Sequence, residues 1–240
     1  SYNTGNVKGE SQVGGIVGYS YEGIMKNIYN TGNVEVNSKY AGGVIGFNYD
    51  GTMENSYNTG AVKGTQHVGG VAGYVDRGTT KKIYNMGNVE GMQDVGGVAG
   101  YNKGKIENSY NKGNVKGESR VEGVVGYNNY NDIITIENSY NTGAVKGAQH
   151  VGGVAGYNRA TIENSYNTGN VKGESQVGGI VGSLEINGKI NKSYNAGAIK
   201  GQSYAGGIVG SSFGVIESSY YCNDNGKITI KDGSKPIEAG

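Results

Sequence analysis

Three carboxylates and one arginine are the side chains of this sequence whose types and spacing come nearest to a recognisable chemistry. Glu22, Asp50 and Asp76 each stand just ahead of a glycine at corresponding places in the chain, and Arg77 follows the third. Carboxylate oxygens are preferred ligands of Ca²⁺, so the three suggest a calcium site. An arginine beside them can act as a base on an acidic polysaccharide, as in a lyase. The alternative is a hydrated turn of mixed charge, which we favour because no lysine or further carboxylate is fixed around the four residues.

Histidine and cysteine chemistry is disfavoured by number and spacing. His67 and His150 are the two histidines, and they occupy the same position in two units of an internal repeat, three units apart. Stacked strands lie about 4.8 Å apart, which separates the two rings by roughly 14 Å, too far for a shared metal. We therefore interpret both as solvent-exposed turn residues. Cys222 is the single cysteine, so an intrachain disulfide and a cysteine-based zinc site are excluded, and we expect no metal and no cofactor.

The repeat that positions these residues has a period of about 27 residues. The pattern Tyr-Asn-x-Gly-x-Val, with Ile for Val in the last full copy, begins at eight tyrosines, and a ninth, degraded copy begins at Tyr220. The eight tyrosines are Tyr2, Tyr29, Tyr57, Tyr84, Tyr110, Tyr140, Tyr166 and Tyr194. A period of this length is typical of a solenoid, in which each unit buries its apolar face against the next.

Composition favours strands and turns within each unit. Glycine fills 47 of 240 positions in step with the repeat, there is one proline, and Leu184 is the single leucine, so collagen and amphipathic helices are both excluded. In the unit that begins at Tyr140, strand-like segments at 144–146, 151–157 and 162–166 are separated by turn residues. The sequence predicts an all-β parallel β-helix of eight to nine coils over residues 1–219, with residues 220–240 as a C-terminal cap.

In such a stack, each repeat position becomes a row of equivalent side chains. The asparagines that begin at Asn3 predict amides that donate to one coil and accept from the next. The glycines that begin at Gly5 predict either a positive φ or an approach too close for a Cβ. The adjacent apolar rows that begin at Ile16 and Val17 require a bend in the backbone or a cover over one row. The tyrosine row suggests either a platform for sugar rings or stacking for stability, and we favour stacking.

Variation in length is concentrated in the turn that follows the glycine-rich segment of each unit. Insertions restricted to one turn of a solenoid map to one edge, which is frequently the binding edge. We predict that side chains on this edge bind a ligand. They are Tyr21, Tyr49, Arg77, Tyr130, Arg159 and Phe213.

The glycine-rich segments resemble the GLUG motif, in which U is an apolar residue and where Ile or Val here takes the place of Leu. Together with the partner segment Asn-Ser-Tyr-Asn-x-Gly, the resemblance covers residues 1–221. The segments are Gly15-Ile16-Val17-Gly18, Gly43-Val44-Ile45-Gly46, Gly70-Val71-Ala72-Gly73, Gly97-Val98-Ala99-Gly100, Gly123-Val124-Val125-Gly126, Gly153-Val154-Ala155-Gly156, Gly179-Ile180-Val181-Gly182 and Gly207-Ile208-Val209-Gly210. GLUG repeats occur in large bacterial surface and secreted proteins, including the non-catalytic part of M26-type IgA metalloproteases. The resemblance implies a bacterial, extracellular, adhesin-like repeat region. It does not imply peptidase activity, because the sequence has no His-Glu-x-x-His.

Charge and hydropathy limit the classes of partner that this chain can bind. With 21 basic and 20 acidic residues the net charge is +1, so the chain has no general field for nucleic acid or anionic membrane. No apolar run approaches the roughly 20 residues needed to cross a bilayer, and no signal peptide is recognisable. Because the chain opens at Ser1 in mid-motif, without Met, we expect flanking domains of a longer parent protein.

We therefore expect a non-enzymatic, extracellular β-solenoid stalk or adhesive scaffold, secreted or on a bacterial cell surface, with host or environmental glycans or proteins as partners. Two alternatives stay open. One is a lyase-like β-helix with its site at Glu22, Asp50, Asp76 and Arg77. The other is an accessory repeat region of a secreted metalloprotease.

Overall fold

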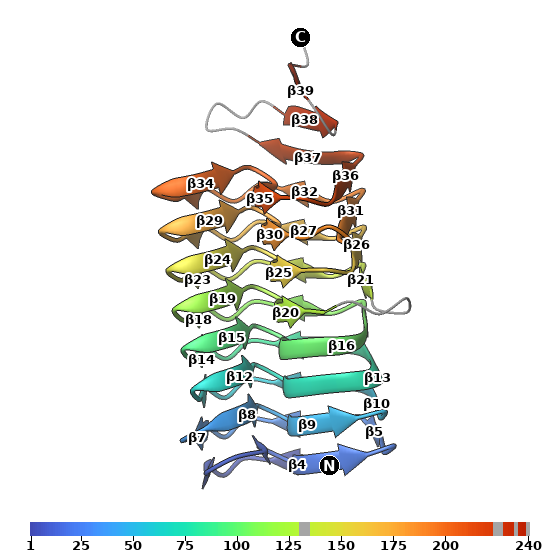
Figure 1. The fold of residues 1–240 in the computed structure, drawn as a ribbon. Coiled ribbons are helices and arrows are strands. Elements are labelled where there is room, and N and C mark those ends of the chain that lie inside the picture. The colour runs from blue at the N-terminus through green and yellow to red at the C-terminus, as the bar shows by residue number, and fades with distance from the viewer. Residues whose placement is uncertain (130–134, 223–227, 233–234, 239–240) are drawn as a thin grey trace.

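The chain winds into a parallel β-solenoid, as the repeat predicts (Figure 1). The computed structural model describes residues 1–129, 135–222, 228–232 and 235–238. Within these residues there are only strands and turns, and about eight turns of the solenoid follow one another at a spacing of about 27 residues. Each coil is made of short, β-branched segments separated by Gly, Asn and bend residues, which is why the strands are two to five residues long in most coils.

Three sheets run along the solenoid. The first contains 23 strands. They are β1 (Tyr2–Asn3), β4 (Val17–Tyr21), β5 (Ile24–Lys26), β6 (Tyr29–Asn30), β9 (Ile45–Tyr49), β10 (Thr52–Asn58), β13 (Ala72–Asn85), β16 (Ala99–Glu107), β17 (Tyr110–Asn111), β20 (Val125–Asn128), β21 (Thr135–Glu137), β22 (Tyr140–Asn141), β25 (Ala155–Asn158), β26 (Thr161–Glu163), β27 (Tyr166–Asn167), β30 (Val181–Leu184), β31 (Lys189–Asn191), β32 (Tyr194–Asn195), β35 (Val209–Ser212), β36 (Val215–Glu217), β37 (Ser219–Cys222), β38 (Ile228–Asp232) and β39 (Lys235–Glu238).

The second and third sheets have eight strands each and are parallel throughout. The second is made of β2 (Val7–Gly9), β7 (Val34–Val36), β11 (Val62–Lys63), β14 (Val89–Glu90), β18 (Val115–Lys116), β23 (Val145–Lys146), β28 (Val171–Lys172) and β33 (Ile199–Lys200). The third is made of β3 (Val13–Gly14), β8 (Lys39–Gly42), β12 (Gln66–Gly69), β15 (Gln93–Gly96), β19 (Ser119–Glu122), β24 (Gln149–Gly152), β29 (Ser175–Gly178) and β34 (Ser203–Gly206).

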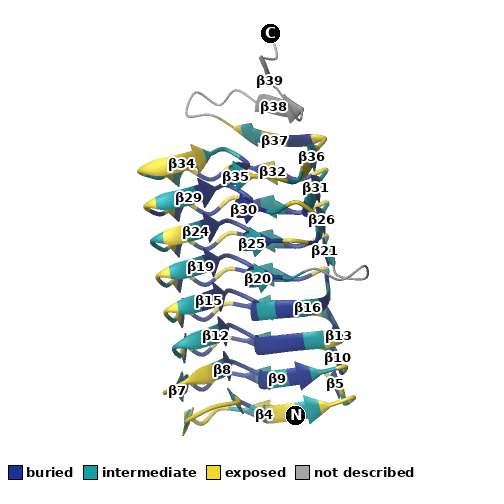
Figure 2. Cartoon of the chain, in the orientation of Figure 1, coloured by how far each residue is buried: buried dark blue, intermediate teal, exposed yellow. Residues whose placement is uncertain are grey.

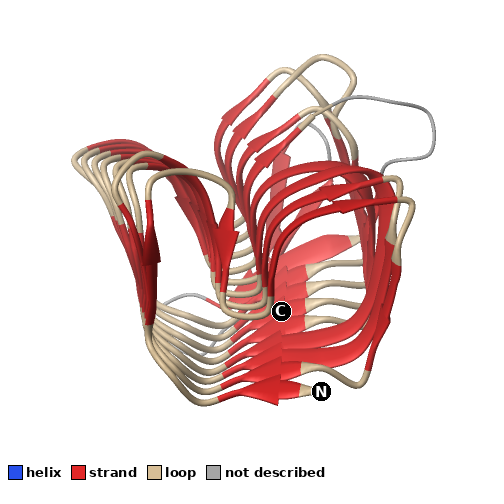
Figure 3. Cartoon of the chain, turned by 90° about the horizontal axis from the view of Figure 1, so that it is seen from below, coloured by secondary structure: helices blue, strands red, loops and turns tan. Residues whose placement is uncertain are grey.

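Seen along its axis, each coil has two lobes, with the backbone folded inward between them (Figure 3). The larger lobe encloses a core built from the rows that include Val44, Ile45 and Met53. The smaller lobe, between the second and third sheets, encloses a separate core built from the rows that include Val34 and Val68. Both cores run through the middle coils as continuous buried bands (Figure 2).

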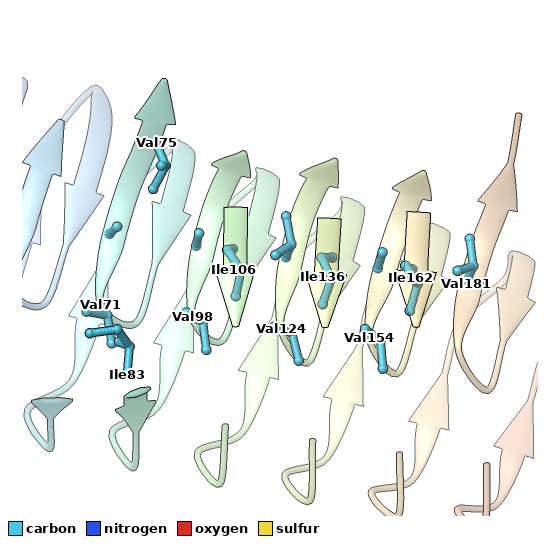
Figure 4. Close-up of a cluster of buried hydrophobic side chains, with 14 of the residues drawn as sticks. Val71, Val75, Ile83, Val98, Ile106, Val124, Ile136, Val154, Ile162 and Val181 are labelled. Carbon is cyan, nitrogen blue, oxygen red and sulfur yellow. The ribbon is translucent and has the colours of Figure 1, made fainter. Parts of the chain in front are cut away.

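The two adjacent apolar rows of the glycine-rich segment both enter the larger core because the backbone bends between the strands. The chain bends at Gly43 and Val44 before β9 begins at Ile45. The amides of Val44 and Ile45 both donate to the carbonyl of Val71, at 2.9 and 3.0 Å. Figure 4 shows the valine row of the middle coils in this core with isoleucines of the facing wall: Val71, Val98, Val124 and Val154, with Ile106, Ile136 and Ile162.

From Asn30 to Asn195, the asparagine row is buried at the corner of each coil and forms a continuous chain of hydrogen bonds. Asn111 Nδ2 donates to the carbonyl of Gly113 at 2.7 Å and to Asn141 Oδ1 at 2.8 Å. Asn85 Nδ2 in turn donates to Asn111 Oδ1 at 2.8 Å. The neighbouring glycine row is explained by close approach: a Cβ on Gly87 would lie 1.9 Å from the carbonyl oxygen of Gly60.

The parallel repeat stops at β37. This strand pairs in parallel with β32, but its other side pairs antiparallel with β38, and β38 pairs antiparallel with β39. The described part of the chain contains no helix that could span a membrane.

Candidate functional site

The predicted binding edge begins with a stack of two tyrosines and an arginine. Tyr21 and Tyr49 are partners in β4 and β9, and their rings stack with centroids 5.2 Å apart. The guanidinium of Arg77 lies 4.5 Å from the centroid of Tyr49, within the range of a cation–π contact. Tyr21 is 61% exposed, so the stack lies on the surface.

Two further predicted residues continue this edge in later coils. The amide of Arg159 donates to the carbonyl of Asn128, and the amide of Phe213 donates to the carbonyl of Leu184. The strand registers place both in the same row as Tyr21 and Tyr49. Both side chains are exposed. Tyr130, the remaining residue of the prediction, lies outside the described residues.

The predicted calcium ligands do not form one row. Asp76 is the register partner of Tyr49, which moves its carboxylate one position away from the row shared by Glu22 and Asp50. Its nearest charged partner is Arg77, with Nε 3.8 Å from Oδ1. Within the described ranges, no group of three or more Asp, Glu, His or Cys side chains is arranged to hold a metal ion.

A different constellation, which sequence reasoning missed, lies where the two lobes meet. We name this region the seam. One side of it is a row of residues with φ between 49° and 65°, which occupy the second position of each strand of the third sheet except in the first coil, where the residue precedes β3. This row, the left-handed row, is Gln12, Tyr40, His67, Asp94, Arg120, His150, Gln176 and Tyr204. The other side is an aromatic row in the first sheet, made of Tyr19, Phe47, Tyr74, Tyr101, Tyr127 and Tyr157.

The two rows of the seam interlock through their rings. His67 stacks on Tyr40 with centroids 5.2 Å apart, and it meets Tyr74 and Tyr101 edge-on at 5.6 and 5.2 Å. His150 meets Tyr157 edge-on at 5.9 Å. Both histidines are therefore half-buried, and the expectation of solvent-exposed turn residues was wrong. The left-handed backbone turns these side chains toward the rings of the other lobe.

Charged groups concentrate in the seam of the middle coils. Asp94 is 1% exposed, and its carboxylate oxygens pair with Nδ1 of His67 at 3.0 Å and with Nε of Arg120. The Arg120 guanidinium also lies 5.0 Å from the ring centroid of Tyr127. His67, Asp94 and Arg120 come from three successive coils, so these contacts tie the coils together where the lobes meet.

Burial perturbs the titration of the seam side chains. Desolvation raises the pKa of Tyr101 to about 12, with the neighbouring Tyr74 as a secondary cause. Desolvation, followed by the positive charge of Arg120, lowers the pKa of His150. At neutral pH, the phenol of Tyr101 is therefore protonated and the imidazole of His150 is neutral.

The tyrosine row that begins at Tyr2 lies on the surface of the larger lobe. Its rings stack with centroids 4.7–5.2 Å apart and nearly parallel planes. A shallow depression of about 340 Å³ beside Tyr57, Tyr84 and Tyr110 is also lined by Asn55 and Lys82. Because neighbouring rings cover one another's faces, this row presents ring edges and hydroxyls outward rather than the open faces that a pyranose ring needs.

The fold and its rows of equivalent side chains define a parallel β-solenoid repeat protein. The GLUG motif model matches four of its segments, residues 9–35, 37–63, 93–116 and 147–172, so the chain carries GLUG-motif repeats. Among solved structures, a putative immunoglobulin A1 protease from Bacteroides ovatus is similar, with 19% sequence identity and a TM-score of 0.50. The match covers 96% of this chain and 74% of that chain, and at this identity it shows the fold alone. No curated protein matches the sequence.

Proposed function

We propose that this chain is a non-enzymatic, extracellular β-solenoid that serves as a stalk or adhesive scaffold of a bacterial surface protein. The observation that carries the proposal is the in-register stacking of near-identical coils. Residues 1–18 recur unchanged at 165–182, and residues 57–74 recur at 140–157 with Thr65 replaced by Ala148. Selection for a catalytic site tends to make one coil unique, whereas a spacer or a multivalent surface requires coils that are interchangeable.

The adhesive surface in this proposal is the edge that carries Tyr21, Tyr49, Arg77, Arg159 and Phe213. These side chains are aromatic or positively charged. Tyr21, Tyr49, Arg159 and Phe213 share one row, and the Arg77 guanidinium of the neighbouring row lies over the ring of Tyr49. The other members of the row that contains Tyr49 are Asp76, Lys103, Asn129 and Glu185. Aromatic and arginine side chains contribute most of the binding energy at many protein interfaces, and such groups also contact sugars. The partners are glycans or proteins of the host or the environment.

Binding of the labelled chain to a glycan array and to immobilised extracellular proteins tests this proposal. We expect binding that falls at least tenfold in the double variant Tyr49→Ala/Arg77→Ala. The matched control is Lys172→Ala/Lys200→Ala, which removes two exposed side chains from the second sheet and leaves the edge intact. Loss of binding in the control but not in the edge variant would contradict the assignment of the edge.

A lyase assay on uronic-acid polymers tests the enzymatic alternative at Glu22, Asp50, Asp76 and Arg77. We expect no turnover, because the carboxylates are spread over two rows and Arg77 is engaged with Tyr49 and Asp76. Turnover that disappears in Asp50→Ala or Arg77→Ala would overturn the non-enzymatic proposal.

The solved relative favours a second setting for the same scaffold, as an accessory region of a secreted protease. Its name describes an immunoglobulin A1 protease, and it shares the solenoid over 96% of this chain. The coding sequence of the parent protein tests this setting: a metalloprotease domain with His-Glu-x-x-His on the same polypeptide supports it, and a parent without one excludes it.

A further inference from the structure

Glu122 occupies a position where every other coil of the third sheet has glycine. Its register partners are Gly96 in the preceding coil and Gly152 in the following coil. The remaining glycines of this row are Gly14, Gly42, Gly69, Gly178 and Gly206. The row lies where the third sheet packs closely against the first: a Cβ on Gly152 would come within 2.0 Å of the carbonyl oxygen of Ala155. A long acidic side chain at this position therefore lies in a closely packed part of the seam.

The Glu122 carboxyl is enclosed and lacks a hydrogen-bond partner. The residue is 0% exposed, and neither carboxyl oxygen has a partner in the described part of the chain. The carboxyl fills the space beside Gly156 of the next coil, where a Cβ would lie 1.3 Å from Glu122 Oε1. An ionised carboxylate in such a place costs several kcal/mol, because nothing replaces its hydration.

The surrounding charges do not offset this cost. Asp94 on β15 carries a like charge, while Arg120 on β19 itself is already paired with Asp94. The other titratable or charged side chains on the strands packed against β19 are Lys116 on β18, Tyr127 on β20, Lys146 on β23, His150 on β24 and Tyr157 on β25. Burial, followed by the negative charge of Asp94, raises the pKa of Glu122 well above its ordinary value of 4.5.

We propose that Glu122 is a proton-operated latch between the fifth and sixth coils. As a neutral carboxylic acid it fills the seam and lets the two lobes pack together. Once ionised, it requires water, which enters when β19 separates locally from β25 at the seam. The solenoid is thus tightest in acid at this joint and loosens there as the pH rises.

The direction of the pH dependence follows from the raised pKa. Below pH 4.5, Glu122 is protonated in both the folded and the unfolded chain, and the side chain imposes no ionisation penalty. As the pH rises above that value, the unfolded chain loses the proton first, so the folded chain loses stability relative to it. The loss continues until the pH passes the folded pKa and then levels off.

The test compares the thermal midpoint of the wild type with that of Glu122→Gln between pH 4 and pH 9. Glutamine keeps the shape and cannot ionise. We expect the midpoint of Glu122→Gln minus that of the wild type to increase as the pH rises. The matched control is Glu118→Gln on the same coil, where the side chain is exposed, and its difference should stay flat. A difference for Glu122→Gln that is independent of pH would overturn the latch.

Hydrogen exchange at pH 6 and pH 9 tests where the solenoid opens. We compare the wild type and Glu122→Gln at the same pH, because the intrinsic rates of amide exchange are then the same in both proteins. The peptides that report on the latch are those that cover residues 150–158. The latch predicts that the wild type loses protection in these peptides at pH 9 and that peptides from the first two coils do not change. Equal protection in both proteins, or loss spread evenly over all coils, would contradict it. The Glu122→Gly variant, which restores the residue of the other coils, should also remove the pH dependence.

Discussion

At the scale of single residues, the buried asparagines show most directly how the repeat encodes the fold. Each amide makes one bond within its own turn and one bond to each neighbouring coil, so its donors and its acceptor are used at a corner that excludes water. Removing one member of the row costs hydrogen bonds on both sides, because each neighbouring amide loses one of its bonds in a buried corner. The bonds therefore stabilise the interior of the stack more than its ends.

Asn111→Ala should lower the free energy of unfolding by about 1–3 kcal/mol. The substitution removes the side-chain bond to the carbonyl of Gly113 in a buried corner. Nδ2 of Asn85 and Oδ1 of Asn141 each lose one of two hydrogen bonds, and they keep the bonds to Gly87 and Gly143. Urea or thermal unfolding followed by circular dichroism measures the loss. Asn114→Ala is the control, because Asn114 is exposed and accepts a single bond, from the amide of Ala144. A midpoint for Asn111→Ala no lower than that of the control would contradict the role of the row.

The sequence predicted this row well and the seam poorly, for the same physical reason. An invariant polar residue in every unit indicates a structural bond that every coil repeats, and Asn111 is such a residue. His67 and His150 differ from the residues at their position in the other coils, and the repeat alone does not say whether that position faces water. The glutamate among glycines at Glu122 was a visible signal, because a charged side chain replaces the residue that a close approach requires.

At the scale of the elements, the second sheet carries a charge pattern that changes along the solenoid. In its first half, lysine and glutamate alternate, and Lys8 pairs with Glu35 at 2.6 Å. Lys116 pairs with Glu90 at 2.9 Å at the change of pattern. Beyond it, Lys146, Lys172 and the lysine of β33 follow one another in register. Like charges in adjacent strand positions repel, and the repulsion is weak because the side chains are exposed.

Lys146→Glu should stabilise the chain by a few tenths of a kcal/mol at low salt, because it converts contacts with Lys116 and Lys172 from repulsive to attractive. The gain should shrink in 1 M NaCl, where such interactions are screened. Chemical denaturation at the two salt concentrations measures both effects.

The matched control for this charge pattern is Lys63→Glu in the first half of the sheet. Lys63 lies between Glu35 and Glu90, so the same substitution there should destabilise the chain at low salt. Shifts of the same sign for both variants would show that the neighbouring charges do not determine the effect.

The sequence predicted that each coil is made of strands, but it did not predict how these strands are arranged around the cores. The alternation of β-branched and turn residues correctly predicted stacked parallel strands, but it did not divide each coil into two lobes. Val34 and Val68 look like further members of one core in the sequence, yet they line a separate core between the second and third sheets. Apolar periodicity indicates that a side chain is buried, but it does not indicate which other side chains it packs against. The inward fold between the lobes depends on glycine contacts between strands, which a single coil does not reveal.

At the scale of the whole molecule, the solenoid faces the general difficulty that its last coil offers unpaired backbone groups to any other strand. At the C-terminal end of the first sheet, β37 pairs antiparallel with β38, and β38 pairs antiparallel with β39, which breaks the parallel repeat. We predict that these strands cap the first sheet. Tyr221 of β37 replaces the asparagine of the row and packs against the larger core. The smaller core is less covered at this end: Ile199 is half-buried and Ala205 is exposed beside a depression of about 200 Å³.

Deleting residues 220–240 should increase self-association, because it removes β37 to β39 and leaves the edge of β32 unpaired above the larger core. Exposed strand edges recruit other chains unless they are covered. Sedimentation velocity over a range of protein concentrations measures the change. The control is a truncation after Asp232, which keeps β37 and β38. The end of the smaller core is the same in the chain of 240 residues and in both truncated proteins, so it does not contribute to the difference. A protein that ends at residue 219 and stays as monomeric as the full chain would show that these strands do not protect the solenoid from end-to-end association.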